Sequence, residues 1–371
     1  MAQQVLGSDP DKARRYAAAK YSLSIIDLVY LLLLLGLCLA FGIPKTFADI
    51  LSGFLPHRGT LIPAYVGVGL LAYYFLTLPL NFYGSFILEH RFALSVQRIP
   101  DWLIDQLKAG ILVYSIALVL AVIFYYTVSH FASFWWLVIA AFWIFFSVIF
   151  AHLFPVVVIP FFFKYRLLSD EVLKTRIMNL SSKMQVRILD CFEIDFSKKT
   201  LKANAAFTGF GASKRVILAD TLKDRYTYDE IEVILAHEFA HYRLRHLARL
   251  MAVDSFLILL LFYIIFVTQG YFLGLFKIPA LSDIASLPLV LLYFVVFETV
   301  TRPLTNFISR VFEREADREA LRVTGLRQAF ISMMEKLASQ NLADRNPHPL
   351  IKLLFFNHPP VDERISMARS Y

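Results

Sequence analysis

Charged residues are scarce in this chain. Asp, Glu, Lys and Arg make up 18% of its 371 residues, whereas 58% are hydrophobic and the mean hydropathy is +0.60. This balance excludes an ordinary soluble protein and predicts a polytopic membrane protein. Cysteine is nearly absent: Cys38 and Cys191 alone give neither a disulfide framework nor a cysteine-based metal site. No cleavable signal peptide is expected, because the first apolar run is too long and lacks a small-residue cleavage site.

Six apolar runs are long enough to cross a bilayer as helices. They cover about Leu23 to Phe41, Leu61 to Phe82, Ile111 to Val128, Phe134 to Phe150, Leu250 to Val267, and Leu287 to Phe307. With the N-terminus inside, 34 of the 37 Lys and Arg residues fall on the inner side and 3 on the outer side. The positive-inside rule applies to short loops, and without the long segment after the fourth run 18 of these residues lie inside against 3 outside. The positive-inside rule therefore predicts cytoplasmic termini. The net charge of +8 then reflects topology and anionic-lipid contact, so nucleic acid is not expected as a partner.

We expect a mainly α-helical fold in four segments. Residues 1–163 form a membrane domain with four spans, 164–249 a cytosolic core, 250–308 two further spans, and 309–371 the rest of the cytosolic domain. The core is predicted to hold a helix near 169–184 and a small sheet built from VRILDCFEIDF and RVILAD. The intervening TGFGASKR, residues 208–215, lacks phosphate-loop spacing, so no nucleotide is expected as a partner, and it is interpreted as a hairpin turn. A seventh span or re-entrant helix near 85–108 stays open.

Some ionisable residues lie in or at the ends of the predicted spans: Asp27, Asp254, Glu298 and Arg302. Such groups are costly in lipid and usually face a cavity or a partner. Because Glu298 and Arg302 are four residues apart, we favour an internal ion pair over a proton relay.

A metal-binding pattern, H-E-x-x-H, occurs in ILAHEFAHYRLRHLARL, residues 234–250. Thr227 and Glu230 form a capping box that starts a helix before it. His237 and His241 then lie about 40° apart around the helix axis, so both imidazoles can reach one ion. Glu238 projects beside the ion, as the general base of zinc peptidases does. A chance match in this composition is expected at well under ~1%.

A catalytic zinc needs a third protein ligand. Glu313 and Asp317, in SRVFEREADREA, are four residues apart on a predicted helix. One of them can therefore ligate the metal while the other accepts a hydrogen bond from the imidazole of a metal ligand. The alternative is that both belong to a solvated charged face of the helix. Helical continuation of the fifth and sixth spans places His241 and Glu313 roughly 9 to 14 Å beyond the same membrane face. We therefore expect one zinc ion per chain on His237, His241 and Glu313. The other histidines are weaker candidates, interpreted as outside, at a span end, or at the surface: His57, His90, His130, His152, His246 and His348.

HEFAH, FEREAD and NHPPVDER together resemble the motifs of the type I CAAX prenyl endopeptidases, which are integral-membrane zinc metalloproteases. Further segments, 78–109, 158–174 and 202–222, are similar in the same order, so the resemblance covers most of the chain. It implies an enclosed water-filled chamber and a set of site residues. The implied zinc ligands are His237, His241 and Glu313, and the implied general base is Glu238. Asp317 would lie behind the ligands, Arg364 would support the site, and His358 would steady the oxyanion. Asn204 and Ala205 would lie on an edge strand that pairs with the substrate.

The resemblance has two departures. Eukaryotic members have one more span at the N-terminus, and ISMARSY carries no dilysine retrieval signal. We therefore expect a bacterial plasma-membrane relative, with the endoplasmic reticulum as the alternative and the active site on the cytosolic side.

The expected function is a zinc metalloendopeptidase acting on a peptide or membrane-anchored protein, with C-terminal processing of prenylated CAAX-type peptides as one option. Alternatives are a quality-control protease for membrane proteins and, in another class, a zinc-dependent scaffold or transporter. Glu238 argues against the last, because a structural zinc site needs no base. An intramembrane protease is disfavoured because HYRLRHLAR is too charged for the bilayer core.

Overall fold

The computed structural model describes residues 10–131, 133–208 and 214–371. Six helices in it are long and apolar enough to cross a membrane, as predicted. They are α1 (Pro10–Ala40), α3 (Arg58–Phe82), α5 (Ile99–His130), α6 (Trp135–Leu153), α11 (His246–Leu275) and α12 (Leu287–Thr324). α3 continues through a π-helical turn (Tyr83–Ile87) into the short helix α4 (Leu88–Arg91). In the same way, α6 continues through a π-helical turn (Phe154–Val158) into α7 (Ile159–Phe162). A 3-10 turn (Ile284–Ser286) precedes α12.

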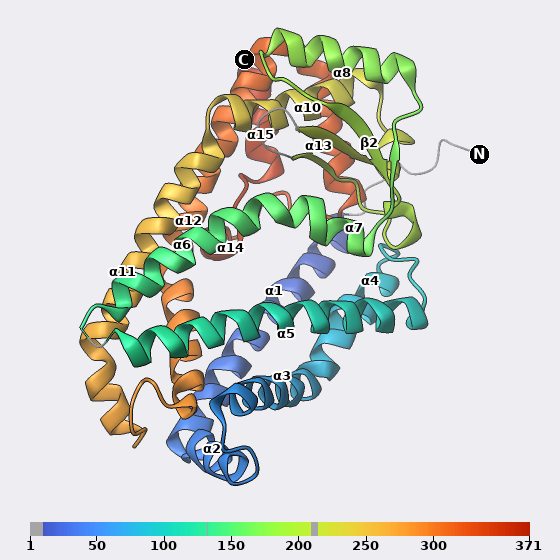
Figure 1. Cartoon of the computed structure of the whole chain (residues 1–371). Coiled ribbons are helices and arrows are strands. Elements are labelled where there is room, and N and C mark those ends of the chain that lie inside the picture. The colour runs from blue at the N-terminus through green and yellow to red at the C-terminus, as the bar shows by residue number, and fades with distance from the viewer. Residues whose placement is uncertain (1–9, 132, 209–213) are drawn as a thin grey trace.

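The connections between the long helices differ from the expectation in one place. A 12-residue helix, α2 (Ile43–Phe54), follows α1 and lies at the end of the molecule opposite the sheet (Figure 1). It was not predicted, because it is too short for a span. Between Arg91 and Ile99 the described chain forms only turns and a short bridge, and α5 runs on without a break. No seventh span therefore lies near 85–108 in the described part of the chain.

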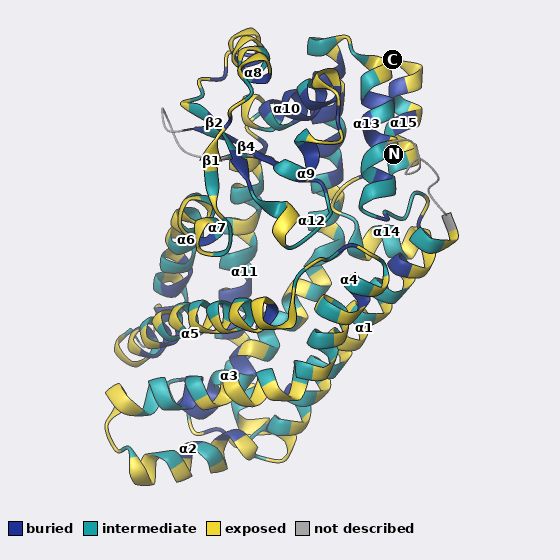
Figure 2. Ribbon diagram, turned by 90° about the vertical axis from the view of Figure 1, so that its right-hand side faces the viewer, coloured by how far each residue is buried: buried dark blue, intermediate teal, exposed yellow. Residues whose placement is uncertain are grey.

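The outer faces of the long helices carry large exposed apolar side chains, yellow on α1, α3 and α5 in Figure 2. Leu33 is 57% exposed, Phe75 65% and Leu107 65%. In water such an apolar surface would be unfavourable, but lipid tails cover it. Between the helices, aromatic rings such as Tyr125 and Phe262 fill a second, buried core.

A four-stranded mixed sheet lies at one end of the helices, where the chain also ends (Figure 1). Its order is β1-β2-β4-β3, with β2 and β4 parallel and the outer pairs antiparallel. The strands are β1 (Tyr165–Leu167), β2 (Asp190–Ile194), β3 (Ala205–Thr208) and β4 (Arg215–Ala219). The two runs predicted as strands thus pair in parallel. β3, the edge strand that the family resemblance implied at Asn204 and Ala205, is the antiparallel partner of β4. Residues 209–213 of the hairpin connection lie outside the described residues.

Helices pack around this sheet and enclose one apolar core, which includes Val216, Leu235 and Phe330. They are α8 (Glu171–Lys183), α9 (Asp220–Lys223), α10 (Tyr228–Arg243), α13 (Arg327–Gln340) and α15 (Val361–Ser370), with a 3-10 turn at Phe196–Lys198. A further short helix, α14 (Pro349–Phe355), packs against α12. α10 packs along the last turns of α12, so the two helices that carry the predicted metal ligands lie side by side.

Candidate active site

The helix with the H-E-x-x-H pattern begins at the predicted capping box. Glu230 N–H donates to Thr227 Oγ1 at 3.3 Å, and Thr227 N–H donates to Glu230 Oε2 at 2.8 Å. Glu230 is buried and also accepts hydrogen bonds from Ser332 and Lys336 of α13 at 2.7 and 2.6 Å. The cap therefore fixes both the start of α10 and its position against α13.

His237, His241 and Glu313 converge between α10 and α12. The Nε2 atoms of the two histidines are 3.1 Å apart, His237 Nε2 lies 3.3 Å from Glu313 Oε2, and His241 Nε2 lies 3.3 Å from Glu313 Oε1. One donor atom from each residue falls within 4.8 Å of the others. The three side chains that the sequence selected are thus brought together by two segments about 70 residues apart in the chain.

The donor atoms of His237, His241 and Glu313, called the donor cluster below, fit a metal ion. Two donors on one tetrahedral zinc ion, each at the usual 2.0 to 2.1 Å, lie about 3.3 Å apart, which agrees with the spacings seen here. Glu313 Oε2 is buried and makes no hydrogen bond within the described part of the chain. A carboxylate oxygen desolvated in this way is costly unless a cation balances it. The residues present are therefore suited to hold one metal ion.

Asp317 lies directly behind His237. Its Oδ1 is 2.8 Å from His237 Nδ1, although the N–H direction is not aligned for a regular hydrogen bond. Asp317 is fully buried, and Arg364 of α15 donates to both of its oxygens at 2.7 and 2.6 Å. Burial lowers the pKa of His237, but its contacts with Asp317 and Glu313 outweigh burial and raise that pKa. The site therefore favours a positive charge where the metal ligands meet.

Glu238 and His358 face a cavity of about 250 Å³ beside the donor cluster. Glu238 is partly buried, and burial raises the pKa of its carboxyl group. His358 comes from the loop between α14 and α15, and its Nε2 lies 3.3 Å from Glu313 Oε1. Both side chains therefore border the space beside the predicted metal ligands.

The loop that carries His358 is held by two polar residues of α12 that sequence reasoning missed. Arg310 is buried and donates to the carbonyls of Lys352 and Phe356, at 3.1 and 2.5 Å. Asn306 donates to two carbonyls at the end of α14. A buried arginine that bonds to main-chain carbonyls leaves no sequence motif, so only its position just before Glu313 could have suggested a role.

His246 was interpreted as a surface or interfacial residue, and that interpretation is wrong. Its side chain is fully buried. Its Nδ1 lies 3.0 Å from His241 Nδ1, and its Nε2 lies 3.0 Å from Glu315 Oε2. The residue was missed because its contact with His241 depends on a break between two helices.

Asn204 and Ala205 lie at the start of β3, the outer strand of the sheet. The carbonyl of Asn204 accepts a hydrogen bond from Ala219 N–H at 3.1 Å, and the Asn204 side chain is exposed. Both residues line the same cavity as His237 and Glu238. The far edge of β3 pairs with no other strand in the described part of the chain, so an unpaired strand edge borders the donor cluster.

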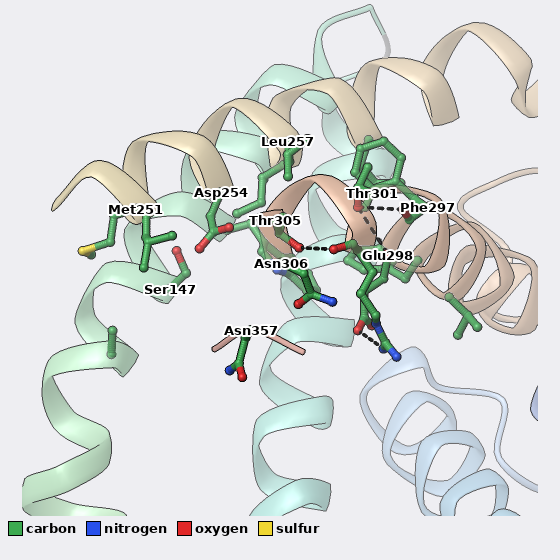
Figure 3. A pocket seen from close by; sticks show the side chains of 18 of the residues that line it. Ser147, Met251, Asp254, Leu257, Phe297, Glu298, Thr301, Thr305, Asn306 and Asn357 are labelled. Carbon is green, nitrogen blue, oxygen red and sulfur yellow. Dashed lines mark hydrogen bonds and ion pairs between the residues drawn. The ribbon is translucent and has the colours of Figure 1, made fainter. Parts of the chain in front are cut away.

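A larger cavity, of about 870 Å³, lies between α6, α11 and α12 at the level of the membrane spans. Asp254 projects into it from α11, and Thr305 and Glu298 from α12 (Figure 3). The predicted ion pair forms, with Arg302 Nη2 2.6 Å from Glu298 Oε1. Asn357 lines this cavity, while the next residue, His358, lines the smaller one. The loop that carries His358 therefore lines both cavities.

Comparison with known proteins decides the family. A family model described as peptidase family M48 matches residues 168–371, which include every site residue above. The chain belongs to peptidase family M48. A second model, CAAX prenyl protease N-terminal with five membrane helices, matches residues 1–164. Four of the six long helices lie in that stretch of the described chain.

Several M48 relatives match over nearly the whole chain. CAAX prenyl protease 1 of Saccharomyces cerevisiae is 29% identical over 388 residues, covering 96% of this chain and 84% of that protein. The uncharacterized metalloprotease YhfN of Bacillus subtilis is 28% identical over 360 residues, with the same coverage. The crystal structure of S. mikatae Ste24p matches with a TM-score of 0.81 and 26% identity, covering 96% of this chain and 87% of that one. The predicted fold and enzyme class are confirmed: this is a multi-pass membrane metalloprotease of the M48 family, with a metal cofactor and peptide substrates.

Proposed function

We propose that the protein is a zinc-dependent endopeptidase that cuts extended, membrane-associated peptides at the cytosolic membrane face, with C-terminal processing of prenylated CAAX-type peptides as its reaction. The observation that carries the proposal is the convergence of His237, His241 and Glu313 beside Glu238 and an unpaired strand edge. The relatives named as CAAX prenyl proteases support the substrate class. The excess of Lys and Arg on one side supports the orientation.

His237, His241 and Glu313 would hold the zinc ion, one per chain, with Asp317 fixing the ring of His237 from behind. Zinc, when bound, supplies a Lewis acid that activates water and polarises the carbonyl of the scissile peptide bond. The Asp317 carboxylate would accept a hydrogen bond from His237 Nδ1–H, which leaves the lone pair of Nε2 toward the metal position. Arg364 keeps Asp317 ionised and in place through its two hydrogen bonds.

Glu238 would act as the general base. A carboxylate with a raised pKa binds a proton more readily than an exposed one, so it can take the proton of the attacking water and then deliver it to the leaving amine. Its place in the cavity wall, next to His237 but outside the donor cluster, is the place this role requires.

His358 would donate to the oxygen of the carbonyl as negative charge develops there. The two hydrogen bonds from Arg310 to main-chain carbonyls would hold the loop of His358 in place next to the donor cluster. The substrate would add a strand to the free edge of β3 near Asn204 and Ala205 through main-chain hydrogen bonds. Such bonds require an extended backbone but depend little on the side chains of the substrate. Low side-chain selectivity follows from this mode of binding.

The membrane cavity would give a membrane-anchored substrate a route to the site. It is lined by apolar residues and a few polar ones, and it reaches the loop of His358 from the level of the lipid. A peptide whose lipid group stays at this level could place its C-terminal residues along β3.

The experiment offers the purified protein a farnesylated C-a-a-X peptide and the same peptide without the lipid, and identifies the products by mass spectrometry. We expect release of the three C-terminal residues from the farnesylated peptide and slower cleavage of the other. Equal cleavage of both would favour a general membrane-protein protease, and cleavage of neither would contradict the proposal.

A further inference from the structure

His246 lies between a metal-ligand candidate and a carboxylate. Its ring is fully buried and stacks on Phe312, with ring centroids 4.6 Å apart and planes 7° apart. One ring nitrogen, Nδ1, faces His241 Nδ1 at 3.0 Å, and the other, Nε2, faces Glu315 Oε2 at 3.0 Å. Arg249 reaches the same oxygen of Glu315 at 3.4 Å. Both nitrogen atoms of this ring therefore lie within hydrogen-bonding distance of a partner.

The backbone is shaped to make this contact. Five residues along a continuous α-helix, His246 would point about 140° away from His241. Instead α10 ends at Arg243 and α11 begins at His246, with Arg245 between them in the left-handed conformation at φ 57°. Residues other than glycine adopt this conformation rarely. The break turns His246 back onto the last turn of α10.

The direction of the hydrogen bonds follows from the partner at the far end. The Glu315 carboxylate only accepts, so His246 Nε2 carries a proton toward it. Two facing ring nitrogens form a hydrogen bond only when one of them carries the proton, so His246 Nδ1 is the acceptor when His241 Nδ1 is the donor. This direction leaves the lone pair of His241 on Nε2, the atom that faces His237 and Glu313.

We propose that His246 is a positioning residue which, held by Glu315, fixes His241 in the orientation and tautomer that bind the metal. His241 would thus be fixed by a His246–Glu315 pair, as His237 is by Asp317 and Arg364. The inference rests on the proposed zinc site, because it assigns a partner to one of that site's ligands.

The test measures zinc affinity of the full-length protein in detergent by competition with a chelator of known affinity. His246→Phe keeps the stacking on Phe312 but removes both hydrogen bonds, and loss of such a partner typically weakens metal binding by about 10- to 100-fold. Glu315→Ala should weaken it less, and should add nothing in the His246→Phe background, since Glu315 acts through His246. The visible spectrum of the cobalt-substituted protein should change in His246→Phe as the orientation of His241 loosens.

Glu319→Ala is the matched control. Glu319 lies one turn beyond Glu315 on α12 and joins α12 to α10 through Arg243 at 2.7 Å, without contact to a metal-ligand candidate. It should bind zinc as the wild type does. Wild-type affinity in His246→Phe, full additivity of the two variants, or equal weakening in Glu319→Ala would each overturn the inference. Failure of the wild type to bind zinc would instead overturn the proposed function.

Discussion

The guanidinium of Arg364 donates to both carboxylate oxygens of Asp317, at 2.7 and 2.6 Å, directly behind His237, and Asp317 is fully buried while Arg364 is largely buried. Removing one member of a buried ion pair leaves an uncompensated charge and typically costs about 3 to 5 kcal/mol. Arg364→Met should therefore lower the midpoint of thermal unfolding strongly.

The double variant Arg364→Met, Asp317→Asn separates stability from function. With both charges removed, the unfolding midpoint should recover toward that of the wild type, whereas zinc affinity should stay low because His237 has lost its carboxylate partner. Recovery of both properties together would show that Asp317 serves stability alone.

The capping box at the start of α10 predicts a pH dependence of stability. Burial raises the pKa of Glu230, but its hydrogen bonds with Lys336 and Ser332 outweigh burial and lower that pKa below its usual range. A depressed carboxyl pKa contributes stability that is present above the unfolded value, near 4.3, and is lost as the pH falls through the folded value.

Glu230→Gln keeps the shape of the cap and removes this contribution. The difference in unfolding midpoint between wild type and Glu230→Gln should hold from about pH 7 to 5 and shrink at lower pH. A difference that stays constant, or grows, on acidification would contradict the ion-pair role of Glu230.

His358 is predicted to act on the transition state and to leave the metal in place. Loss of one oxyanion donor typically lowers kcat by about 10²- to 10³-fold. His358→Ala should show this loss with zinc content near one per chain, determined by elemental analysis. Glu335→Ala, an exposed change on α13, serves as the control and should leave both values unchanged. Loss of zinc in His358→Ala would make this residue a ligand.

The orientation in the membrane can be tested in a variant without Cys38 and Cys191. A cysteine at Tyr371, near the sheet, should resist an impermeant maleimide added to intact cells. One at Ser52, exposed on α2 at the opposite end, should react. Labelling at Tyr371 and protection at Ser52 would reverse the proposed topology.

The sequence predicted the features that depend on local patterns. The six spans follow from run length, the start of α10 from Thr227 and Glu230, and the pairing of His237 with His241 from helical spacing. Joining Glu313 to them required only that two neighbouring spans end at the same membrane face. These features are set by the period of a helix and the thickness of a bilayer.

The features that were missed depend on tertiary structure. His246 meets His241 only because the chain turns at Arg245, and Arg310 acts through main-chain carbonyls that any residue could supply. The parallel pairing of β2 with β4 was missed as well, because the residue pattern of the two runs indicates strands but not which strand pairs with which. The resemblance to the prenyl endopeptidases named Arg364 and His358 but gave no partner for Arg364, which the structure supplies in Asp317.

The most direct test of the account is the rate of peptide hydrolysis by Glu238→Gln, compared with the wild type at equal zinc content. Glutamine keeps the volume and helix propensity of glutamate but cannot accept the proton of water. We predict one zinc ion per chain in both proteins, a rate about 10²- to 10⁴-fold lower in the variant, and substrate that binds without being cut. A variant that cleaves at nearly the wild-type rate would contradict the assignment of Glu238 and, with it, the proposed chemistry of the site.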